Sequence, residues 1–192
     1  MLRRRLCRFA RFACCTLMLS AQAACKKGES APTTTSPIDG AGVPATLVVT
    51  STAFAGGGVI PKTFTCDGDD KSPDLAWTGA PKETKSFALI VDDPDAPGGT
   101  WTHWVHFDVP AATARLDVGS SVGVSGKNDF GKDAYGGPCP PAGKGAHRYF
   151  FKLYALDVDK LGPAAGASRD DVEKAMSSHL LARGELMGKF ER

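Results

Sequence analysis

Polar residues stand at the ends of three apolar, β-branched segments of the sequence. Asp93 ends one such segment, His103 lies near the start of a second, and His147 with Tyr149 begins a third. A protonated histidine carries positive charge and donates hydrogen bonds, and a nearby carboxylate favours that form. If these groups converge, they form a small polar pocket over an apolar core. We expect Asp93 to orient His103 and keep it cationic, with His147 and the Tyr149 hydroxyl completing the site.

Glycine- and proline-rich loops stand beside these polar groups. Residues 93–97, Asp-Pro-Asp-Ala-Pro, form a turn that two prolines make rigid, and Asp95 either braces that turn or contacts a ligand. Gly136 and Gly137 begin the run Gly-Gly-Pro-Cys-Pro-Pro shortly before His147. Because glycine turns leave backbone amides accessible, and such amides bind anions, we expect the Gly136 and Gly137 amides to help hold an anion.

Two short motifs that often mark metal or catalytic sites carry little weight here. His103 and His106 have an odd spacing, so on a strand their side chains point to opposite faces and would not share a metal. Residues 119–123 match Gly-x-Ser-x-Gly, but a nucleophilic Ser121 needs a following helix, and the residues after it are turn-like. We expect no metal, no cofactor and no catalytic residues. A hydrolase using Asp93 and His103 as acid and base is the last alternative.

Side-chain alternation along predicted strands supports this choice of polar groups. Three segments rich in β-branched and aromatic residues are predicted strands: 86–92, 101–109 and 149–158. Alternation continues the apolar face of the first strand into Asp93 and that of the third into His147. In the second segment it places His103, Val105 and Phe107 together on one face. The three polar ends would then meet at one end of the core.

One amphipathic helix is predicted near the C-terminus. Ser168 can cap its first turn, with Asp171 in the capping-box position. The residues of one helix face follow at helical spacing: Val172, Ala175, Met176, His179 and Leu180. Gly184 is the predicted stop, and residues 186–190 return as a short strand. Because strands dominate and do not alternate regularly with helices, the predicted fold is mainly β, an antiparallel β-sandwich with a C-terminal helix and few other helices.

Residues 1–24 have the pattern of a signal peptide. Five arginines are the only charged residues there, a mostly apolar run covers residues 12–24, and small residues close it before Cys25. Residues 21–23, Ala-Gln-Ala, fit cleavage to a soluble periplasmic or secreted protein, whereas Ala-Ala-Cys at 23–25 resembles a lipobox, in which the cysteine is lipidated. The favoured interpretation is a periplasmic protein anchored to a bacterial membrane through a lipid on Cys25.

Cysteine parity favours the lipoprotein interpretation. Removal of the signal peptide leaves three cysteines, Cys25, Cys66 and Cys139. If Cys25 is lipidated, the other two form an even pair in an oxidising compartment, which suggests a Cys66–Cys139 disulfide. Residues 25–45 are rich in Pro, Gly, Ser and Thr and are predicted to form a flexible linker, so that the folded domain occupies residues 46–192.

Several motifs of the chain resemble the phosphatidylethanolamine-binding protein family. They are DPDAP at 93–97, Trp-x-His at 101–103 and GGPCPPxGxxAHRYFFKLYALD at 136–157, with TCDG at 65–68, SPxLxW at 72–77 and ELMG at 185–188 resembling its bacterial Raf-kinase-inhibitor-like (YbhB/YbcL) branch. The resemblance covers residues 48–192. It implies a β-rich fold with a pocket for phosphate-like groups, and by motif the pocket residues are Asp93, Asp95, Trp101, His103, Pro141, His147 and Tyr149.

Composition and resemblance together narrow the function. With 23 basic and 21 acidic residues the net charge is only +2, which gives no reason to expect nucleic acid as a partner. We expect an exported binding protein for a small phosphate-like anion or a phospholipid head group, with modulation of a partner protein as a further role. The main alternative is an inhibitor of a protease or another protein that uses the domain surface. Similar bacterial proteins also form homodimers, although no residue here indicates an interface.

Overall fold

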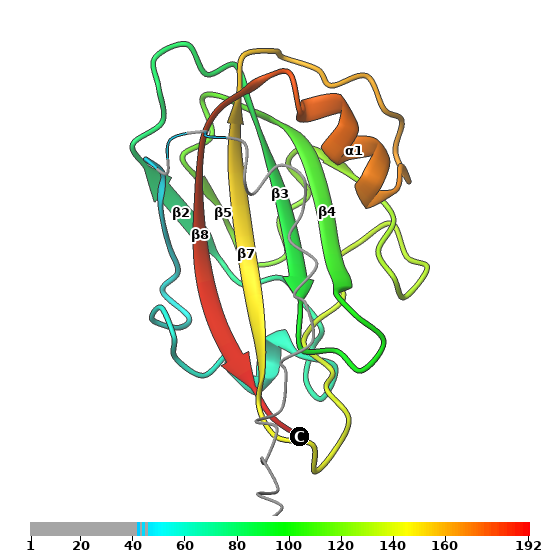
Figure 1. The fold of residues 1–192 in the computed structure, drawn as a ribbon. Coiled ribbons are helices and arrows are strands. Elements are labelled where there is room, and N and C mark those ends of the chain that lie inside the picture. The colour runs from blue at the N-terminus through cyan, green and yellow to red at the C-terminus, as the bar shows by residue number, and fades with distance from the viewer. Residues whose placement is uncertain (1–41, 43, 45) are drawn as a thin grey trace, which may run out of the picture. The chain divides into compact units, whose positions relative to one another are not determined.

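The computed structural model describes residues 42, 44 and 46–192, which form two antiparallel sheets, one α-helix and one short 3-10 helix (Figure 1). The elements in chain order are β1 (Val48–Thr50), η1 (Lys62–Phe64), β2 (Leu75–Thr78), β3 (Ser86–Asp93), β4 (Trp101–Pro110), β5 (Arg115–Leu116), β6 (Val124–Ser125), β7 (His147–Leu156), α1 (Arg169–Met176) and β8 (Leu180–Phe190). The small sheet has the order β1-β2-β5 and the large sheet β6-β4-β3-β7-β8. The predicted mainly β fold with a C-terminal helix is confirmed.

The predictions for the N-terminal part concern residues that the structure does not describe. The signal peptide at 1–24, the lipidated Cys25 and the linker at 25–45 lie outside the described residues, apart from positions 42 and 44. Among residues 42, 44 and 46–192, no helix is long and apolar enough to cross a bilayer.

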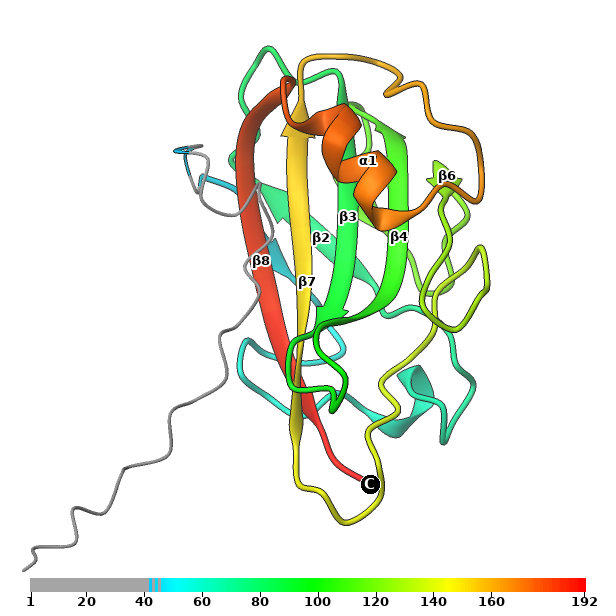
Figure 2. The same cartoon turned by 45° about the vertical axis from the view of Figure 1, so that its right-hand side comes forward.

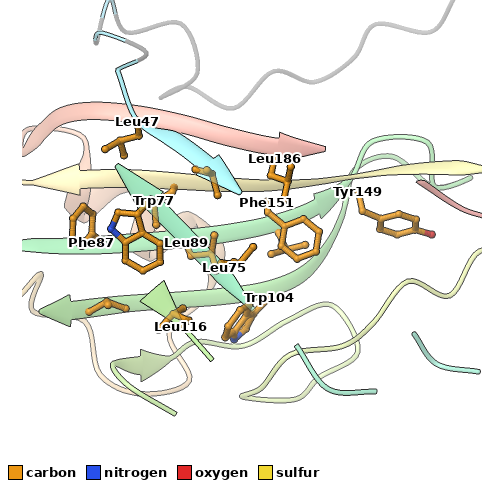
Figure 3. Close-up of a cluster of buried hydrophobic side chains, with 14 of the residues drawn as sticks. Leu47, Leu75, Trp77, Phe87, Leu89, Trp104, Leu116, Tyr149, Phe151 and Leu186 are labelled. Carbon is orange, nitrogen blue, oxygen red and sulfur yellow. The ribbon is translucent and has the colours of Figure 1, made fainter. Parts of the chain in front are cut away.

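The main hydrophobic core lies between the two sheets (Figure 3). Alternation along β3 sends Phe87, Leu89 and Val91 to this side, where they meet Leu75 and Trp77 of β2. β7 contributes four further side chains to the same core: Tyr149, Phe151, Leu153 and Ala155. Since burying a large apolar side chain contributes about 1.5–3 kcal/mol, this layer is a principal source of stability.

The opposite face of the large sheet is covered by α1 (Figure 2). Ile90 of β3 points to this side, in a second apolar cluster that contains Val172 and Met176 of the helix. Ser168 caps the helix as predicted, because its hydroxyl oxygen accepts a hydrogen bond from the Asp171 amide at 3.2 Å. Apolar layers on both faces explain why β3 is buried along its whole length.

The helix ends earlier than the sequence indicated. α1 stops at Met176, whereas the apolar spacing continued to Leu180 and Gly184 was the predicted stop. Residues Leu180–Phe190 instead form β8, which pairs with β7 along its length. Gly184 is required inside that strand, because a Cβ atom there would lie 2.1 Å from the Leu47 carbonyl oxygen. Backbone pairing with β7 thus outweighs the local helical pattern.

β4 departs twice from regular alternation. Its pairing with β3 passes over His103 and is shifted again near Asp108, whose φ of 55° is left-handed. These bulges explain one wrong prediction: Val105 and Phe107 pack on the α1 side of the sheet and do not share a face with His103. A bulge re-aims side chains locally, and here it directs His103 to the side that carries Asp93.

Candidate functional site

A small pocket lies where β3 ends and β4 and β7 begin. Figure 2 shows these strand ends together at the lower end of the large sheet. Its volume is about 190 Å³, which is smaller than the roughly 300–1,000 Å³ of sites for drug-sized ligands. Its lining residues are Asp93, Ala96, Pro97, Trp101, His103, Phe130, Cys139, Pro140, Pro141 and His147. The structure therefore brings five of the predicted residues together, with ionisable groups only at Asp93, His103 and His147.

The Asp93 carboxylate is buried and both of its oxygens accept hydrogen bonds. Oδ2 accepts from Nδ1 of His147 at 2.7 Å, and Oδ1 accepts from the Asp95 backbone amide at 2.8 Å. His147 is only 6% exposed, so the pair is shielded from bulk water. The carboxylate stabilises positive charge on the His147 ring and fixes its orientation, because a carboxylate can only accept and Nδ1 must carry the proton.

His103 has a different partner from the one expected. Its Nδ1 donates a hydrogen bond to the Gly136 carbonyl oxygen at 2.7 Å, while Asp93 is bound to His147. The pKa of His103 is lowered from its ordinary value chiefly because burial penalises the charged ring, which outweighs the favourable Gly136 carbonyl and Asp93 charge. The expectation that Asp93 orients His103 and keeps it cationic is wrong. Gly136 orients this ring, and its neutral form is favoured.

Tyr149 supports the pocket floor without lining the pocket. Its side chain is fully buried, and its ring stands edge-on to that of His103 with 5.1 Å between centroids. In Figure 3 it lies at one end of the main core, with its hydroxyl directed away from the core. Burial, followed by the charge of Asp93, raises the pKa of this phenol, so it stays neutral across the physiological range.

The Gly136 and Gly137 amides are not available to a ligand. The Gly136 amide donates to the His103 carbonyl oxygen at 2.9 Å, and the Gly137 amide donates to Asp70 Oδ1 at 2.6 Å. A Cβ atom at Gly137 would lie 2.5 Å from the Phe64 carbonyl oxygen, so the two chain segments pass too close for a side chain. The expectation that these amides bind an anion is wrong, because both amides hold the loop in place.

A disulfide ties the pocket wall to the loop after η1. Cys139, which lines the pocket, is bonded to Cys66, the pair that cysteine parity suggested. The Cys66 amide also donates to the Pro138 carbonyl oxygen at 3.2 Å. Arg192 lies against the same bond, with Nη1 3.2 Å from Cys139 Sγ. Two segments that are distant in sequence are thereby crosslinked beside the pocket.

Asp95 braces its turn and does not line the pocket. Its two carboxylate oxygens accept from Nε and Nη2 of Arg148 at 2.8 and 2.6 Å, and Oδ2 also accepts from the Arg148 amide at 3.0 Å. The Arg148 hydrogen bonds hold the pKa of Asp95 below its ordinary value. The first of the two roles considered for Asp95 therefore fits the geometry: it joins the turn after β3 to the start of β7.

Comparison with known proteins agrees with the motifs. A family model described as phosphatidylethanolamine-binding protein matches residues 50–191. The chain belongs to this family. The UPF0098 protein of Aquifex aeolicus is 51% identical over 154 residues, covering 77% of this chain and 90% of that protein. The UPF0098 protein of Chlamydia trachomatis is 40% identical over 152 residues, covering 76% and 99%.

Two solved structures of the phosphatidylethanolamine-binding protein family have the same fold. One is a putative homolog, CT736, from Chlamydia trachomatis, with a TM-score of 0.72 and 39% identity, covering 76% of this chain and 97% of that one. The other is YbcL of Escherichia coli, with a TM-score of 0.72 and 34% identity, covering 77% and 99%. The fold around the pocket is therefore one that this family shares.

Sequence reasoning missed the aromatic wall residue Phe130 and Asn128, which holds its loop. Phe130 lines it, with ring centroids 5.5 Å from Trp101 and 5.3 Å from His103. Asn128 holds the Phe130 loop, because its Oδ1 accepts from the Phe130 amide at 3.1 Å and its Nδ2 donates to the Ala134 carbonyl oxygen at 2.8 Å. The only sequence signal was the turn-forming run around Asn128, which gives no indication that Phe130 reaches the pocket.

The ionisable groups of the pocket are two histidines and one carboxylate. No lysine or arginine is among its lining residues in the described part of the chain. A group of three or more His, Cys, Asp or Glu able to hold a metal ion is also absent from residues 42, 44 and 46–192. An anion in this pocket therefore meets imidazole groups surrounded by an apolar rim.

Proposed function

We propose that the protein is an exported, membrane-tethered binding protein whose pocket takes a small phosphate-like anion. The observation that carries the proposal is the buried Asp93–His147 pair beside His103, at the bottom of a pocket with apolar walls. Protonated His147 donates from Nε2 toward the pocket, while Asp93 stabilises its positive charge. Trp101 and Phe130, 38% and 41% exposed, leave the mouth open to an organic group attached to the anion.

The balance of charge predicts weak binding. Asp93 already neutralises His147, so the pocket offers an anion little net positive charge. Binding therefore uses the Nε2–H donor of the protonated His147 ring. A small volume of about 190 Å³ and the absence of lysine or arginine among the described lining residues support a single small anionic group as the ligand.

The test is an NMR titration of the full chain with inorganic phosphate and phosphoethanolamine at pH 5.5 and 7.5. We expect chemical-shift changes confined to the pocket residues and larger at pH 5.5. His147→Gln should abolish them. His179→Gln is the matched control, because His179 contacts Asp157 and is not a pocket residue. The absence of shifts at both pH values would overturn the proposal and favour a protein partner bound at the surface.

Export and lipid anchoring belong to the same proposal. A signal-peptide pattern at 1–24, Cys25 after small residues and the Cys66–Cys139 disulfide all support an oxidising compartment outside the cytoplasm. Metabolic labelling with a fatty-acid analogue tests it: the wild-type chain should incorporate the label, and Cys25→Ser should not. Labelling that survives Cys25→Ser, or is absent from the wild type, would contradict the anchor.

The contact between Asp93 and His103 on which the hydrolase alternative depends is not formed. It requires Asp93 and His103 to act together as acid and base, but Asp93 Oδ2 is hydrogen-bonded to His147 and His103 Nδ1 to Gly136. A protein-inhibitor role retains one specific observation in its favour, which is the exposed edge-to-face pair of Trp101 and Phe130 at the pocket mouth. If the surface binds a protein there, phosphate should compete with that partner.

A further inference from the structure

The two pocket histidines offer different chemistry to a ligand. A carbonyl oxygen can only accept, so the 2.7 Å bond to Gly136 fixes the proton of His103 on Nδ1. In the neutral ring the other nitrogen, Nε2, then carries a lone pair. Since burial lowers the pKa of His103, the ring stays neutral near neutral pH, and Nε2 is a hydrogen-bond acceptor.

His147 is the complementary group. Its Nδ1 proton is held by Asp93 at 2.7 Å, and the buried carboxylate stabilises positive charge on this ring. In the protonated ring Nε2–H is a donor. The pocket floor therefore presents one acceptor, at His103, and one charged donor, at His147.

The groups around His103 do not change this assignment. Its ring meets the apolar ring of Phe130 and the edge of Tyr149, whose raised pKa keeps the phenol neutral. The Gly136 and Gly137 carbonyls and the charges of Asp92 and Asp93 act on it, and burial outweighs them all. Asp92 in turn lies within 3.2 Å of the cations of Lys152 and Arg169, which offset its charge.

From this arrangement we infer that the pocket selects an oxyanion that still carries an acidic hydroxyl: the hydrogen-phosphate form of a phosphate monoester, or of phosphate itself. One P–O–H group donates to Nε2 of His103, and one P–O⁻ oxygen accepts from Nε2–H of His147. The inference rests on the proposed function and goes further by excluding two ligand classes. Phosphodiesters, including intact phospholipid head groups, and sulfates have no acidic hydrogen at this pH.

The excluded ligands meet a repulsive contact. A sulfate or diester oxygen placed against His103 would bring lone pair against lone pair, or would require a proton on the buried ring. Sites built around a substrate hydroxyl discriminate strongly against analogues that lack it, because a buried polar group is then left unpaired. Phosphate monoesters lose their second proton at a pKa of about 6, so both forms of the ligand are present near that pH.

The experiment compares four ligands on the full chain at pH 6.0 by calorimetry or NMR titration: inorganic phosphate, methyl phosphate, sulfate and dimethyl phosphate. We expect sulfate and dimethyl phosphate to bind at least about 10-fold more weakly than the first two. Sulfate is the sharpest control, because it matches phosphate in shape and lacks the acidic hydrogen. If all four bind within about twofold of one another, the inference is wrong and the anion proposal stands. If none binds, the anion proposal itself fails.

A spectroscopic measurement separates this mechanism from simple steric selection. ¹⁵N spectra of the histidine side chains should place the proton of His103 on Nδ1, and Nε2 should remain unprotonated when phosphate binds. His179, paired with Asp157 outside the pocket, serves as the internal reference. A doubly protonated His103 in the phosphate complex would overturn the inference even if phosphate were preferred over sulfate.

Discussion

Asp92 and Asp93 are neighbours on β3, and the strand sends them to opposite faces with different consequences. Asp92 faces the α1 side, where the Lys152 ammonium and the Arg169 guanidinium both lie 3.2 Å from its Oδ2. Asp93 faces the pocket, where its partners are a titratable imidazole and a backbone amide. Both side chains are almost fully buried, at 2% and 3% exposed. Burial and residue type are thus the same, and the partners decide which carboxylate has a structural role and which can serve a ligand.

The partners differ in how they respond to protons. Lysine and arginine remain charged throughout the physiological range, so the network around Asp92 is permanently neutralised. It extends to the helix, because Arg169 also donates to Glu173 at 2.7 Å. The partner of Asp93 is an imidazole, which can be neutral or charged. A fixed network joins α1 to the large sheet, and a titratable pair lies at the pocket.

Removing the charge of Asp92 should give the largest effect on stability. Asp92→Asn removes the buried carboxylate from between the partly buried cations of Lys152 and Arg169, of which Arg169 retains Glu173. Breaking a buried ion pair costs about 3–5 kcal/mol. Urea unfolding should report this loss, with the exposed Asp159→Asn as the matched control and a change within about 0.5 kcal/mol. Equal stabilities for the two variants would contradict the structural role of Asp92.

Removing the charge of Asp93 should affect binding more than stability. Asp93→Asn takes away the carboxylate that supports a cationic His147, so phosphate affinity at pH 6.0 should fall at least about 10-fold, which is about 1.4 kcal/mol. The buried site retains an amide, so the free energy of unfolding should fall by about 1–3 kcal/mol. The comparison between the two carboxylates would be contradicted if folded Asp92→Asn lost as much phosphate affinity as Asp93→Asn.

Acidification should destabilise the protein through two other buried histidines. The pKa values of His103 and His106 are both lowered from the ordinary value, chiefly by burial. A base with a depressed folded-state pKa is protonated first in the unfolded chain, so stability is full above a pH of about 6.5 and falls below it. Each histidine can cost up to about 2 kcal/mol by pH 5.

The measurement is urea unfolding of the wild type and of His106→Gln between pH 7.5 and 5. His106 contacts Val122 and Ser125, and it does not line the pocket. Replacing it should reduce the slope of stability against pH without changing the ratio of phosphate to sulfate affinity. An unchanged slope would show that His106 titrates normally in the folded protein.

The smallest effect is expected at Asp95. Its pair with Arg148 is bidentate but partly exposed, with the arginine side chain 47% accessible. Exposed pairs contribute about 0.2–1 kcal/mol, so Asp95→Asn should lower stability within that range. Phosphate affinity should change less than about threefold, because Asp95 acts only on the turn that carries Asp93. A loss as large as that of Asp93→Asn would make Asp95 a ligand contact.

Local sequence pattern predicted the elements whose environment is regular. β3 and β7 alternate without interruption on the core side, so Asp93 and His147 could be placed at the pocket end from period-two spacing alone. The Ser168 cap needed only the chemistry of one hydroxyl and one nearby amide. The cysteine count suggested the Cys66–Cys139 pair, because parity constrains pairing without any geometry.

The sequence by itself determined the two-sheet class of fold, the family and half of the residues that line the pocket. Only the tertiary structure decided how those residues act: a bulge aims His103, the Gly136 carbonyl accepts its hydrogen bond, and Asp93 pairs with His147. It also ended α1 early, because Leu180–Phe190 pairs with β7. The physical reason is common to these cases. Alternation and capping depend on neighbours in the chain, whereas hydrogen-bond partners come from segments far apart in sequence, and competition among them is settled only when the sheets pack.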